Sequence, residues 1–251
     1  MPTPVVEIRN VTKKFFVTKP FYKRMLNPFG VRKKIFALKD VSFGIEAGQI
    51  LGVVGPNGAG KTTLIKILAD VLEADSGRIM LCGRELHKYN RCLRSRIGYV
   101  SSDERSFFWR LTGRQNLEFF GRLYGLSAKE TLGRVPQILE EFNFEKRADQ
   151  LFRDYSTGMR KKIAVMRALL HQPQIVLLDE VTNSLDPASA GMVKTFIRKY
   201  VSGQAYCASI WSTHRLEEIA EVCDKVIIIE NGKVCFYGCI DSFNNTEFSK
   251  N

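Results

Sequence analysis

Residues 55–62 read Gly55-Pro56-Asn57-Gly58-Ala59-Gly60-Lys61-Thr62, which matches the pattern GxxxxGK[ST] at every defined position. An apolar run at residues 49–54 precedes this stretch, and a helical pattern of apolar residues follows it at 63–68. Glycine allows the backbone to turn so that successive N–H groups face one anion, and the following helix adds its positive dipole end. The sequence therefore predicts a phosphate-binding loop between a buried strand and a helix.

The side chains that end this stretch suit a nucleoside triphosphate bound with Mg²⁺. Lys61 supplies a cation for the β- and γ-phosphates, and the Thr62 hydroxyl is an oxygen ligand for the metal. We therefore expect ATP and Mg²⁺ as cofactors. The expected nucleotide contacts in and just after the loop are Gly55, Pro56, Asn57, Gly58, Ala59, Gly60, Lys61, Thr62 and Thr63.

A second apolar strand ends in two carboxylates, at residues 175–180. The carboxyl ends of parallel strands share one edge of a sheet, so Asp179 is expected beside the phosphate loop, as the second protein ligand of Mg²⁺. Glu180 follows directly and is suitably placed to orient and polarise the attacking water. An apolar strand that ends in Asp-Glu does not by itself indicate a functional site. The phosphate loop in the same sequence is what favours a role for these two carboxylates.

The arrangement of apolar segments predicts an α/β fold. Short buried strands at 175–178, 209–212 and 226–229 alternate with helices, which is typical of a mostly parallel, doubly wound sheet of the P-loop NTPase type. Strands at 5–8 and 41–45 suggest an antiparallel portion near the N-terminus. Between about 112 and 170 the pattern is helical and predicts an inserted helical lobe. Its apolar faces are expected to carry Leu117, Phe120, Leu123 and Tyr124, and Ile138, Leu139 and Phe142.

Composition restricts the class of protein. With 251 residues, 45% hydrophobic and 25% charged, the chain is neither disordered nor fibrous. Apolar runs such as 175–178 contain four residues, whereas a membrane span needs roughly 20. The N-terminus lacks a charged head followed by an apolar stretch, so we expect no secretory signal and a cytoplasmic location. The six cysteines show no CxxC spacing, which favours reduced thiols, several of them in the core, over a metal site.

In the order of its motifs the chain resembles the ATP-binding subunits of ABC transporters, from about residue 5 to about residue 238. Tyr155-Ser156-Thr157-Gly158-Met159 stands where that family carries its LSGGQ signature, and Ser184-Leu185-Asp186 resembles its D-loop. Ser212-Thr213-His214 resembles the segment with the family's switch histidine. His214 also follows a strand at the sheet end, from which an imidazole can reach the γ-phosphate and the water held by Glu180.

This resemblance implies a head-to-tail pair of subunits that clasp two ATP molecules. Ser156 and Gly158 then act in trans on the nucleotide held by the partner's phosphate loop, and Asp186 belongs to the same nucleotide-contacting set. The implied partners are a second ATP-binding subunit, identical or not, and transmembrane permease subunits. The implied location is the cytoplasmic face of the cell membrane, with peripheral membrane contact.

Several positions depart from the family pattern. After the strand at 97–100 the family usually places Pro-Gln, and Ser101-Ser102 stands here instead. Ser102 is expected to reach Mg²⁺ through water, with Asp103 and Glu104 as alternatives. Thr157 and Met159 replace Gly and Gln in the signature, and Val181 replaces the usual Pro after Glu180. Because a hydroxyl and backbone N–H groups still suit a phosphate, we expect hydrolysis to be retained.

Phe15 stands where the family places the aromatic side chain that stacks on adenine. Two alternatives stay open: Phe16 performs the stacking, or Phe15 belongs to the core. The expected domain spans 5–238, with an ATPase core at about 5–100 and 171–238 and a helical lobe at about 101–170. A basic insert at 16–35 interrupts it, and 239–251 form a short C-terminal tail.

The net charge of +12 is concentrated near this insert, because residues 11–34 hold eight Lys or Arg and no Asp or Glu. A short helix there would gather Phe21, Tyr22, Met25 and Leu26 on one face. We expect the insert to dock at the membrane side, on anionic lipid or on the transmembrane partner. A loop folded onto its own domain remains the alternative.

The length of the insert favours export. It separates Phe15 from residues 37–42, and a similar extension occurs in subunits that resemble exporters of polysaccharides or other large envelope molecules. The substrate stays open among polysaccharide, lipid, peptide and drug. Two other functions have weaker support from the sequence. A soluble ABC ATPase acting on nucleic acid or the ribosome usually has tandem domains or long arms, so no nucleic acid is expected. A non-hydrolysing scaffold is disfavoured because Lys61, Asp179 and Glu180 are all present.

Overall fold

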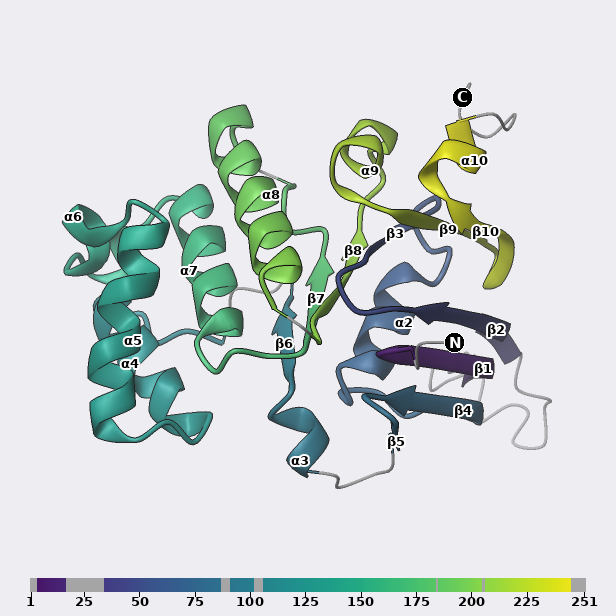
Figure 1. Cartoon of the computed structure of the whole chain (residues 1–251), viewed down its shortest axis with the longest axis horizontal. Helices are drawn as coiled ribbons and strands as arrows, with labels where there is room; N and C mark the ends of the chain where they lie inside the picture. Colours follow the sequence, from purple (N-terminus) through teal and green to yellow (C-terminus); the bar gives the residue numbers. More distant parts are fainter. Residues whose placement is uncertain are drawn as a thin grey trace, which may run out of the picture.

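The computed structural model describes residues 4–16, 34–86, 91–101, 106–183, 185–204 and 206–244. Its centre is a six-stranded sheet in the order β10-β9-β3-β8-β7-β6 (Figure 1). All neighbouring strands are parallel except the pair of β9 and β10. Five strands therefore end at one edge, where Asp179 lies opposite Ser212. The strands are β3 (Ile50–Val54), β6 (Ile97–Val100), β7 (Ile175–Asp179), β8 (Ala208–Ser212), β9 (Lys225–Glu230) and β10 (Lys233–Cys239).

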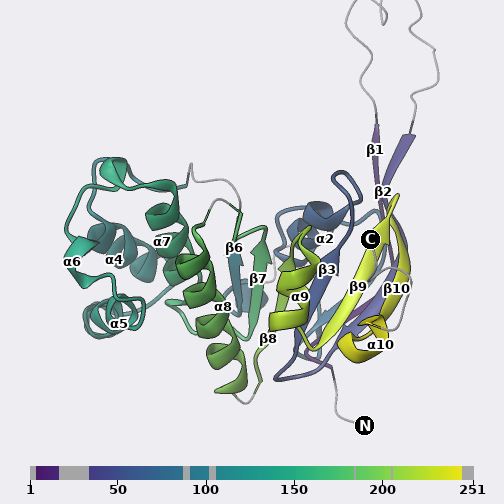
Figure 2. The ribbon, with the colours of Figure 1, turned by 90° about the horizontal axis from the view of Figure 1, so that it is seen from above.

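A second, antiparallel sheet is built from the N-terminal part of the chain. Its order is β2-β1-β4-β5, with β1 (Val6–Phe16), β2 (Lys34–Ile45), β4 (Ser76–Leu81) and β5 (Arg84–Glu85). The register pairs Val6 with Ile45 at one end of the β1–β2 hairpin and Phe16 with Lys34 at the other. Figure 2 shows this second end projecting from the body of the molecule.

Successive side chains of a buried strand point to opposite faces of the large sheet, and a hydrophobic core lies on each face. Ile175 and Leu177 belong to the core shared with α2 (Lys61–Leu68) and the antiparallel sheet. Val176 and Leu178 belong to the core shared with the helices on the opposite face. All four side chains are at most 1% exposed. A strand buried on both faces reads as a continuous apolar run, which explains residues 175–178.

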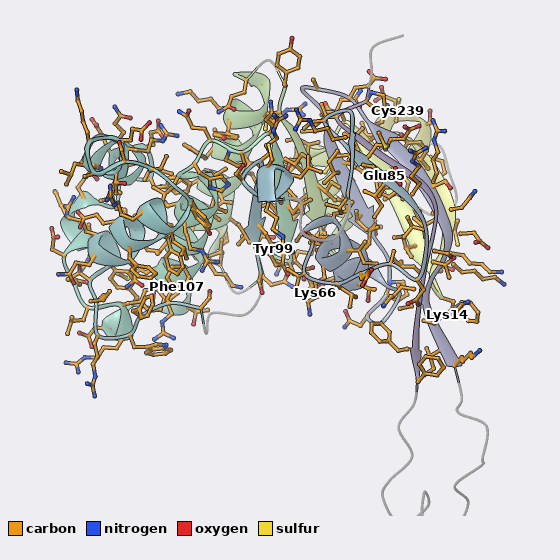
Figure 3. All side chains as sticks on the ribbon, turned by 90° about the horizontal axis from the view of Figure 1, so that it is seen from below. Lys14, Lys66, Glu85, Tyr99, Phe107 and Cys239 are labelled. Carbon is orange, nitrogen blue, oxygen red and sulfur yellow. The ribbon has the colours of Figure 1, made fainter. Side chains whose placement is uncertain are left out.

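The chain between β6 and β7 forms the helical lobe, which lies apart from the β1–β2 hairpin (Figures 1 and 3). Thr112 and Ser127 cap its first two helices through capping boxes with Gln115 and Glu130. Such caps satisfy backbone N–H groups that have no partner inside the helix. The elements of the lobe are α4 (Gly113–Leu123), α5 (Ala128–Glu141), α6 (Glu145–Ala148), the 3₁₀ turn η1 (Phe152–Asp154) and α7 (Thr157–Leu169).

The remaining helices are α3 (Arg91–Arg94), α8 (Pro187–Ser202), α9 (Leu216–Val222) and α10 (Ile240–Asn244). The helix α10 lies within the range expected as a C-terminal tail, and its Phe243 is buried, with its ring centroid 6.0 Å from that of Phe236. Within the described ranges, no helix combines the length and the apolar character that crossing a membrane requires.

The predicted α/β fold, with a mostly parallel sheet and an antiparallel portion near the N-terminus, is confirmed. One expected core residue of the lobe is wrong: Leu123 is 64% exposed, because six residues after Leu117 it has turned away from the buried face. Cys207 and Cys223 are buried as expected, whereas Cys92, Cys235 and Cys239 are exposed. Predictions for residues 17–33, Ser102, Asp103, Glu104 and Ser184 lie outside the described residues.

Candidate functional site

The phosphate loop connects β3 to α2, as the sequence predicts, and two of its glycines are structurally required. Gly55 has φ 154° and Gly60 has φ 114°. A Cβ atom on Gly55 would lie 2.1 Å from the Ile229 carbonyl oxygen, and one on Gly60 would lie 2.3 Å from the Ala37 oxygen. Both contacts are with backbone, which cannot move aside as a flexible side chain can. The loop therefore keeps its shape only with glycine at these positions.

The Lys61 side chain lies against the backbone of this loop. Its Nζ donates hydrogen bonds to the carbonyl oxygens of Gly55, at 2.6 Å, and Pro56, at 3.1 Å. Burial lowers the pKa of the Lys61 ammonium, while the nearby carboxylates of Glu180 and Asp179 act to raise it. The fold thus holds a partly desolvated cation between the loop and two acidic side chains.

Thr62 and Asp179 come together although they are far apart in sequence. The Thr62 Oγ1 donates to Asp179 Oδ1 at 3.2 Å, and Ser212 Oγ donates to the same oxygen at 2.7 Å. Asp179 is 1% exposed, so its carboxylate depends on these hydroxyls. A carboxylate and a hydroxyl at the end of a phosphate loop are the hard oxygen donors that Mg²⁺ prefers, so the residues present fit this metal.

Glu180 follows β7 in a strained backbone conformation. Its φ is 51°, in the left-handed region that non-glycine residues seldom adopt. The surroundings hold it there: the Glu180 N–H lies 3.0 Å from Ser212 Oγ and 3.2 Å from Ser212 O. Asn183 Nδ2 donates to Glu180 Oε2 at 3.0 Å. The backbone conformation and these hydrogen bonds together fix the direction of the Glu180 carboxylate.

His214 reaches the same carboxylate from the neighbouring strand. Its Nδ1 lies 3.9 Å from Glu180 Oε1, and the two side chains are 50% and 28% exposed. His214 follows β8 by two residues, so the parallel pairing of β7 and β8 brings both side chains to one edge of the sheet. Glu180 and His214 therefore lie side by side at this edge, and both side chains remain partly exposed.

Sequence analysis did not identify Glu218 as a residue of this site. Glu218, on α9, is 4% exposed and its Oε2 accepts hydrogen bonds from Thr182 Oγ1, at 2.8 Å, and Thr213 Oγ1, at 2.9 Å. It lies beside Glu217 and close to Glu221, both exposed. No local pattern distinguishes one acid of this run from another. Only its spacing of four residues from His214 could have drawn attention to it.

The signature residues lie in a different part of the molecule. Ser156 is the N-cap of α7 and accepts from the Met159 N–H at 3.3 Å, and Gly158 lies in the first turn. Asp186 caps α8 and accepts from the Ser189 N–H at 2.9 Å. Hydrogen bonds from the Ser189 side chain and from its backbone N–H hold the pKa of the Asp186 carboxyl below its usual range. Among the residues that the structure describes, no hydrogen bond or ion pair joins Ser156, Gly158 or Asp186 to the phosphate loop.

The two candidate adenine contacts, Phe15 and Phe16, are both on the projecting end of β1. Phe15 is 43% and Phe16 53% exposed, so neither belongs to the core. Lys13 Nζ lies 5.7 Å from the centroid of the Phe15 ring, and Lys34 Nζ lies 5.8 Å from that of Phe16. Adjacent residues of a strand point to opposite faces, so only one of the two rings can face a given ligand.

Comparison with known proteins gives consistent results. A family model described as ABC transporter matches residues 38–183. The ABC transporter ATP-binding protein NatA of Bacillus subtilis is 36% identical over 219 residues, which cover 87% of this chain and 88% of NatA. The daunorubicin resistance ATP-binding protein DrrA3 of Streptomyces coeruleorubidus is 35% identical over 82% of this chain. The Nod factor export ATP-binding protein I of Ralstonia nicotianae is 33% identical over 83%. The matches span 64% and 65% of the lengths of these last two relatives.

Solved structures agree in fold. The ATP-binding cassette MJ0796, in a dimeric post-hydrolysis state bound to ADP and Pi, superposes with a TM-score of 0.80 at 22% identity, covering 94% of this chain and 98% of that one. An ATP-binding subunit of an ABC transporter superposes with a TM-score of 0.79 at 25% identity, covering 98% of this chain and 93% of the other.

Proposed function

Because the chain belongs to the ABC transporter family of ATP-binding proteins, we propose that it binds and hydrolyses ATP to power transport across the cytoplasmic membrane. The observation that carries the proposal is the meeting of Lys61, Thr62 and Asp179 at the phosphate loop, with Glu180 and His214 on the same sheet edge. We propose a single domain over residues 5–238, with an ATPase core, a helical lobe at 101–170 and the basic insert at 16–35.

In this proposal the loop binds the phosphates of ATP through its backbone N–H groups and the Lys61 ammonium. The low exposure of Lys61 supports this role, because a partly desolvated cation attracts an anion more strongly than a hydrated one does. Thr62 and Asp179 would hold Mg²⁺, with Ser102 contributing through water. The ion would supply charge neutralisation at the β- and γ-phosphates. Phe15 would stack on adenine.

Glu180 acts as the residue that orients and polarises the attacking water. A carboxylate fixed by backbone strain and by Asn183 needs little rearrangement when the water arrives, which supports this assignment. His214 shares the water and the γ-phosphate with Glu180. The separation of 3.9 Å between His214 Nδ1 and Glu180 Oε1 is compatible with one small ligand contacting both groups.

The active form is a head-to-tail pair of ATP-binding subunits. Ser156, Gly158 and Asp186 make no described contact with their own phosphate loop, which favours their action on the partner's nucleotide. The dimeric state of the MJ0796 cassette, similar in fold, is consistent with this arrangement.

The transmembrane partners are separate permease subunits, and the direction of transport is export. Relatives named for drug resistance and for Nod factor export support this direction. The substrate classes are polysaccharide, lipid, peptide and drug. We also propose peripheral contact with the cytoplasmic face of the membrane through the β1–β2 hairpin. Its exposed end carries Phe16 and Phe36 together with lysines, the combination that suits an anionic bilayer surface.

The experiment that tests this function is a steady-state ATPase assay on the purified chain, alone and with a permease subunit recovered from native membranes. The chain should hydrolyse MgATP, and Glu180→Gln should bind ATP while losing turnover by about 100-fold or more. A wild-type chain that binds ATP without hydrolysing it would favour the scaffold function. Glu180→Gln turnover at the wild-type rate would remove Glu180 from the mechanism.

A further inference from the structure

The helix α9 contributes a buried carboxylate to which the proposed mechanism gives no role. Glu218 is 4% exposed, and one of its oxygens, Oε2, accepts both the Thr182 and the Thr213 hydroxyl. Its other oxygen, Oε1, lies 3.6 Å from Arg215 Nη1. Desolvating a carboxylate is costly unless hydrogen bonds or opposite charge compensate, so these contacts fix the position of the Glu218 side chain.

The two threonines belong to the two segments that carry the proposed catalytic groups. Thr182 comes two residues after Glu180, and Thr213 comes one residue before His214. A single carboxylate oxygen therefore joins the turn that follows β7 to the turn that follows β8. The two hydroxyls are buried as well, at 0% exposure each, so water does not compete for these bonds.

A second tether joins the same segments on the other side of Glu180. Ser212 Oγ donates to Asp179 Oδ1 at 2.7 Å and accepts from the Glu180 N–H at 3.0 Å. The Thr213 N–H donates to Val53 O at 3.2 Å, and the Arg215 N–H donates to Thr213 Oγ1 at 3.1 Å. The backbone on both sides of His214 is thus anchored, to the strand before the phosphate loop and, through Thr213, to Glu218.

We propose that Glu218 is a positioning residue that sets the distance between Glu180 and His214 by holding Thr182 and Thr213 together. Because its side chain is buried and bonded to the two threonines, Glu218 acts through the two turns. Without it the Ser212 tether remains, but the segment after Glu180 and the segment before His214 lose their shared anchor. This inference rests on the proposed ATPase function, because it assigns Glu218 a part in the same reaction.

The chemistry of the contact predicts which substitution is tolerated. Both threonine hydroxyls donate to one oxygen, and glutamine also presents one amide oxygen that can accept two hydrogen bonds. Glu218→Gln therefore keeps the link and loses only the interaction with Arg215, which is half-exposed. Glu218→Ala removes the link entirely and leaves two buried hydroxyls without their acceptor.

The test is the steady-state kinetics of ATP hydrolysis by the full chain. Glu218→Ala should lower kcat about 10- to 100-fold, since a displacement of about 1 Å at reacting groups has effects of this size. KM for ATP should stay within about twofold, because the phosphate loop is not touched. Glu218→Gln should restore kcat to within about threefold of wild type. Glu221→Ala, on an exposed acid of the same helix, is the matched control.

A double mutant distinguishes the positioning role from a merely structural one. If Glu218 acts through His214, Glu218→Ala should lower kcat by less than about twofold in the His214→Ala background, because the effects of groups that act together are not additive. A merely structural role would lower kcat equally in both backgrounds. Equal effects in both backgrounds, or a folded Glu218→Ala variant with wild-type kcat, would overturn the proposal. If Glu218→Ala does not fold, Thr182→Val removes one donor and should show the same loss of kcat with unchanged KM. A wild-type chain without ATPase activity would instead defeat the proposed function.

Discussion

At the level of single residues, the site depends on charged groups that the fold has partly removed from water. Lys61 is 4% exposed, and its nearest oxygen acceptors are the carbonyls of its own loop. Asp179, 1% exposed, is held by two hydroxyls. A charge held in this way needs no reorganisation when the opposite charge of a ligand arrives, which makes the interaction stronger than it is in water.

Lys61→Ala should abolish tight ATP binding, because it removes the side-chain cation that faces the β- and γ-phosphates. Saturating nucleotide, at about a hundred times its Kd, should stabilise the wild-type chain by about 2.7 kcal/mol, or about 5–10 °C in Tm. The mutant should show a shift below about 1 °C. Lys66→Ala, on the exposed side of the same helix, is the control. An equal shift in Lys61→Ala and wild type would reject the loop as the ATP site.

Removal of Mg²⁺ should separate binding from chemistry. With excess chelator, ATP hydrolysis should fall to background and recover when Mg²⁺ is restored, because the γ-phosphate charge is no longer neutralised. Thr62→Val removes the hydroxyl that bonds Asp179 and should raise the Mg²⁺ concentration needed for half-maximal activity. Metal-independent hydrolysis, or an unchanged Mg²⁺ requirement in the variant, would contradict the assignment of Thr62 and Asp179.

At the level of elements, the β1–β2 hairpin has two different faces. Its register pairs Lys14 with Phe36 and Phe16 with Lys34, so these four residues share one face. Lys14 Nζ lies 5.2 Å from the centroid of the Phe36 ring. The pair of Phe15 and Ile35 lies on the other face, where the proposed adenine contact is. Figure 3 shows Lys14 near the projecting end of the strand, away from the lobe that carries Phe107.

The aromatic and basic face should bind anionic lipid. The wild-type chain should float with vesicles of phosphatidylglycerol, less with phosphatidylcholine, and less again as salt is raised, because exposed charges are screened. Phe36→Ala should reduce the bound fraction by burying less apolar area in the headgroup region. Replacing residues 17–33 by a short Gly-Ser linker should reduce it further, since five Lys or Arg are lost.

The control for this experiment is Leu132→Ala, which removes a side chain that is 66% exposed on α5 in the lobe. Its vesicle binding should equal that of wild type. Equal binding to neutral and anionic vesicles, or full binding after replacement of 17–33, would exclude lipid as the partner of this hairpin. Loss of folding in the linker variant would indicate that the segment belongs to the domain itself.

At the level of the whole molecule, the candidate residues fall into two groups. Lys61, Asp179, Glu180 and His214 meet at one edge of the large sheet. Ser156 and Gly158 lie at the start of α7, without a described contact to that edge. In the proposed mechanism, each chain carries two halves of a nucleotide site, and a head-to-tail pair would complete both sites at once.

Glu180→Gln in the presence of ATP should accumulate a dimer that size-exclusion chromatography with light scattering detects. Adding Ser156→Arg should keep the chain monomeric while ATP binding, measured by thermal shift, stays intact. Arg at this position also removes an N-cap, a loss of about 1 kcal/mol. Ser127→Arg, which removes the N-cap of α5, is therefore the matched control and should still dimerise. ATP-driven dimerisation of the Ser156→Arg variant would contradict a role in trans.

The tertiary structure also explains why local sequence patterns did not predict the exposure of Leu123, the helix-capping roles of Ser156 and Asp186, or the full lengths of β1 and β2. Leu123 fits the apolar pattern of its helix and is exposed, because the partner surface covers only one side of α4. Ser156 and Asp186 are helix caps as well as family motif residues, and a motif cannot separate these two roles. The long strands β1 and β2 extend beyond their apolar cores, because antiparallel pairing continues into the basic segment.

By itself, the sequence determined the phosphate loop, the strand that ends in Asp179 and Glu180, and the α/β architecture around them. These features are encoded locally: glycine spacing sets the backbone of a turn, and an apolar run sets a buried strand. Only the tertiary structure decided that Ser212 binds both Asp179 and the Glu180 backbone, and that Glu218 joins Thr182 to Thr213. Apart from the bond between Thr213 and Glu218, five residues apart, these contacts join residues 32 to 36 positions apart in the sequence. The pairing of β7 with β8, rather than any local pattern, brings those residues within hydrogen-bond distance.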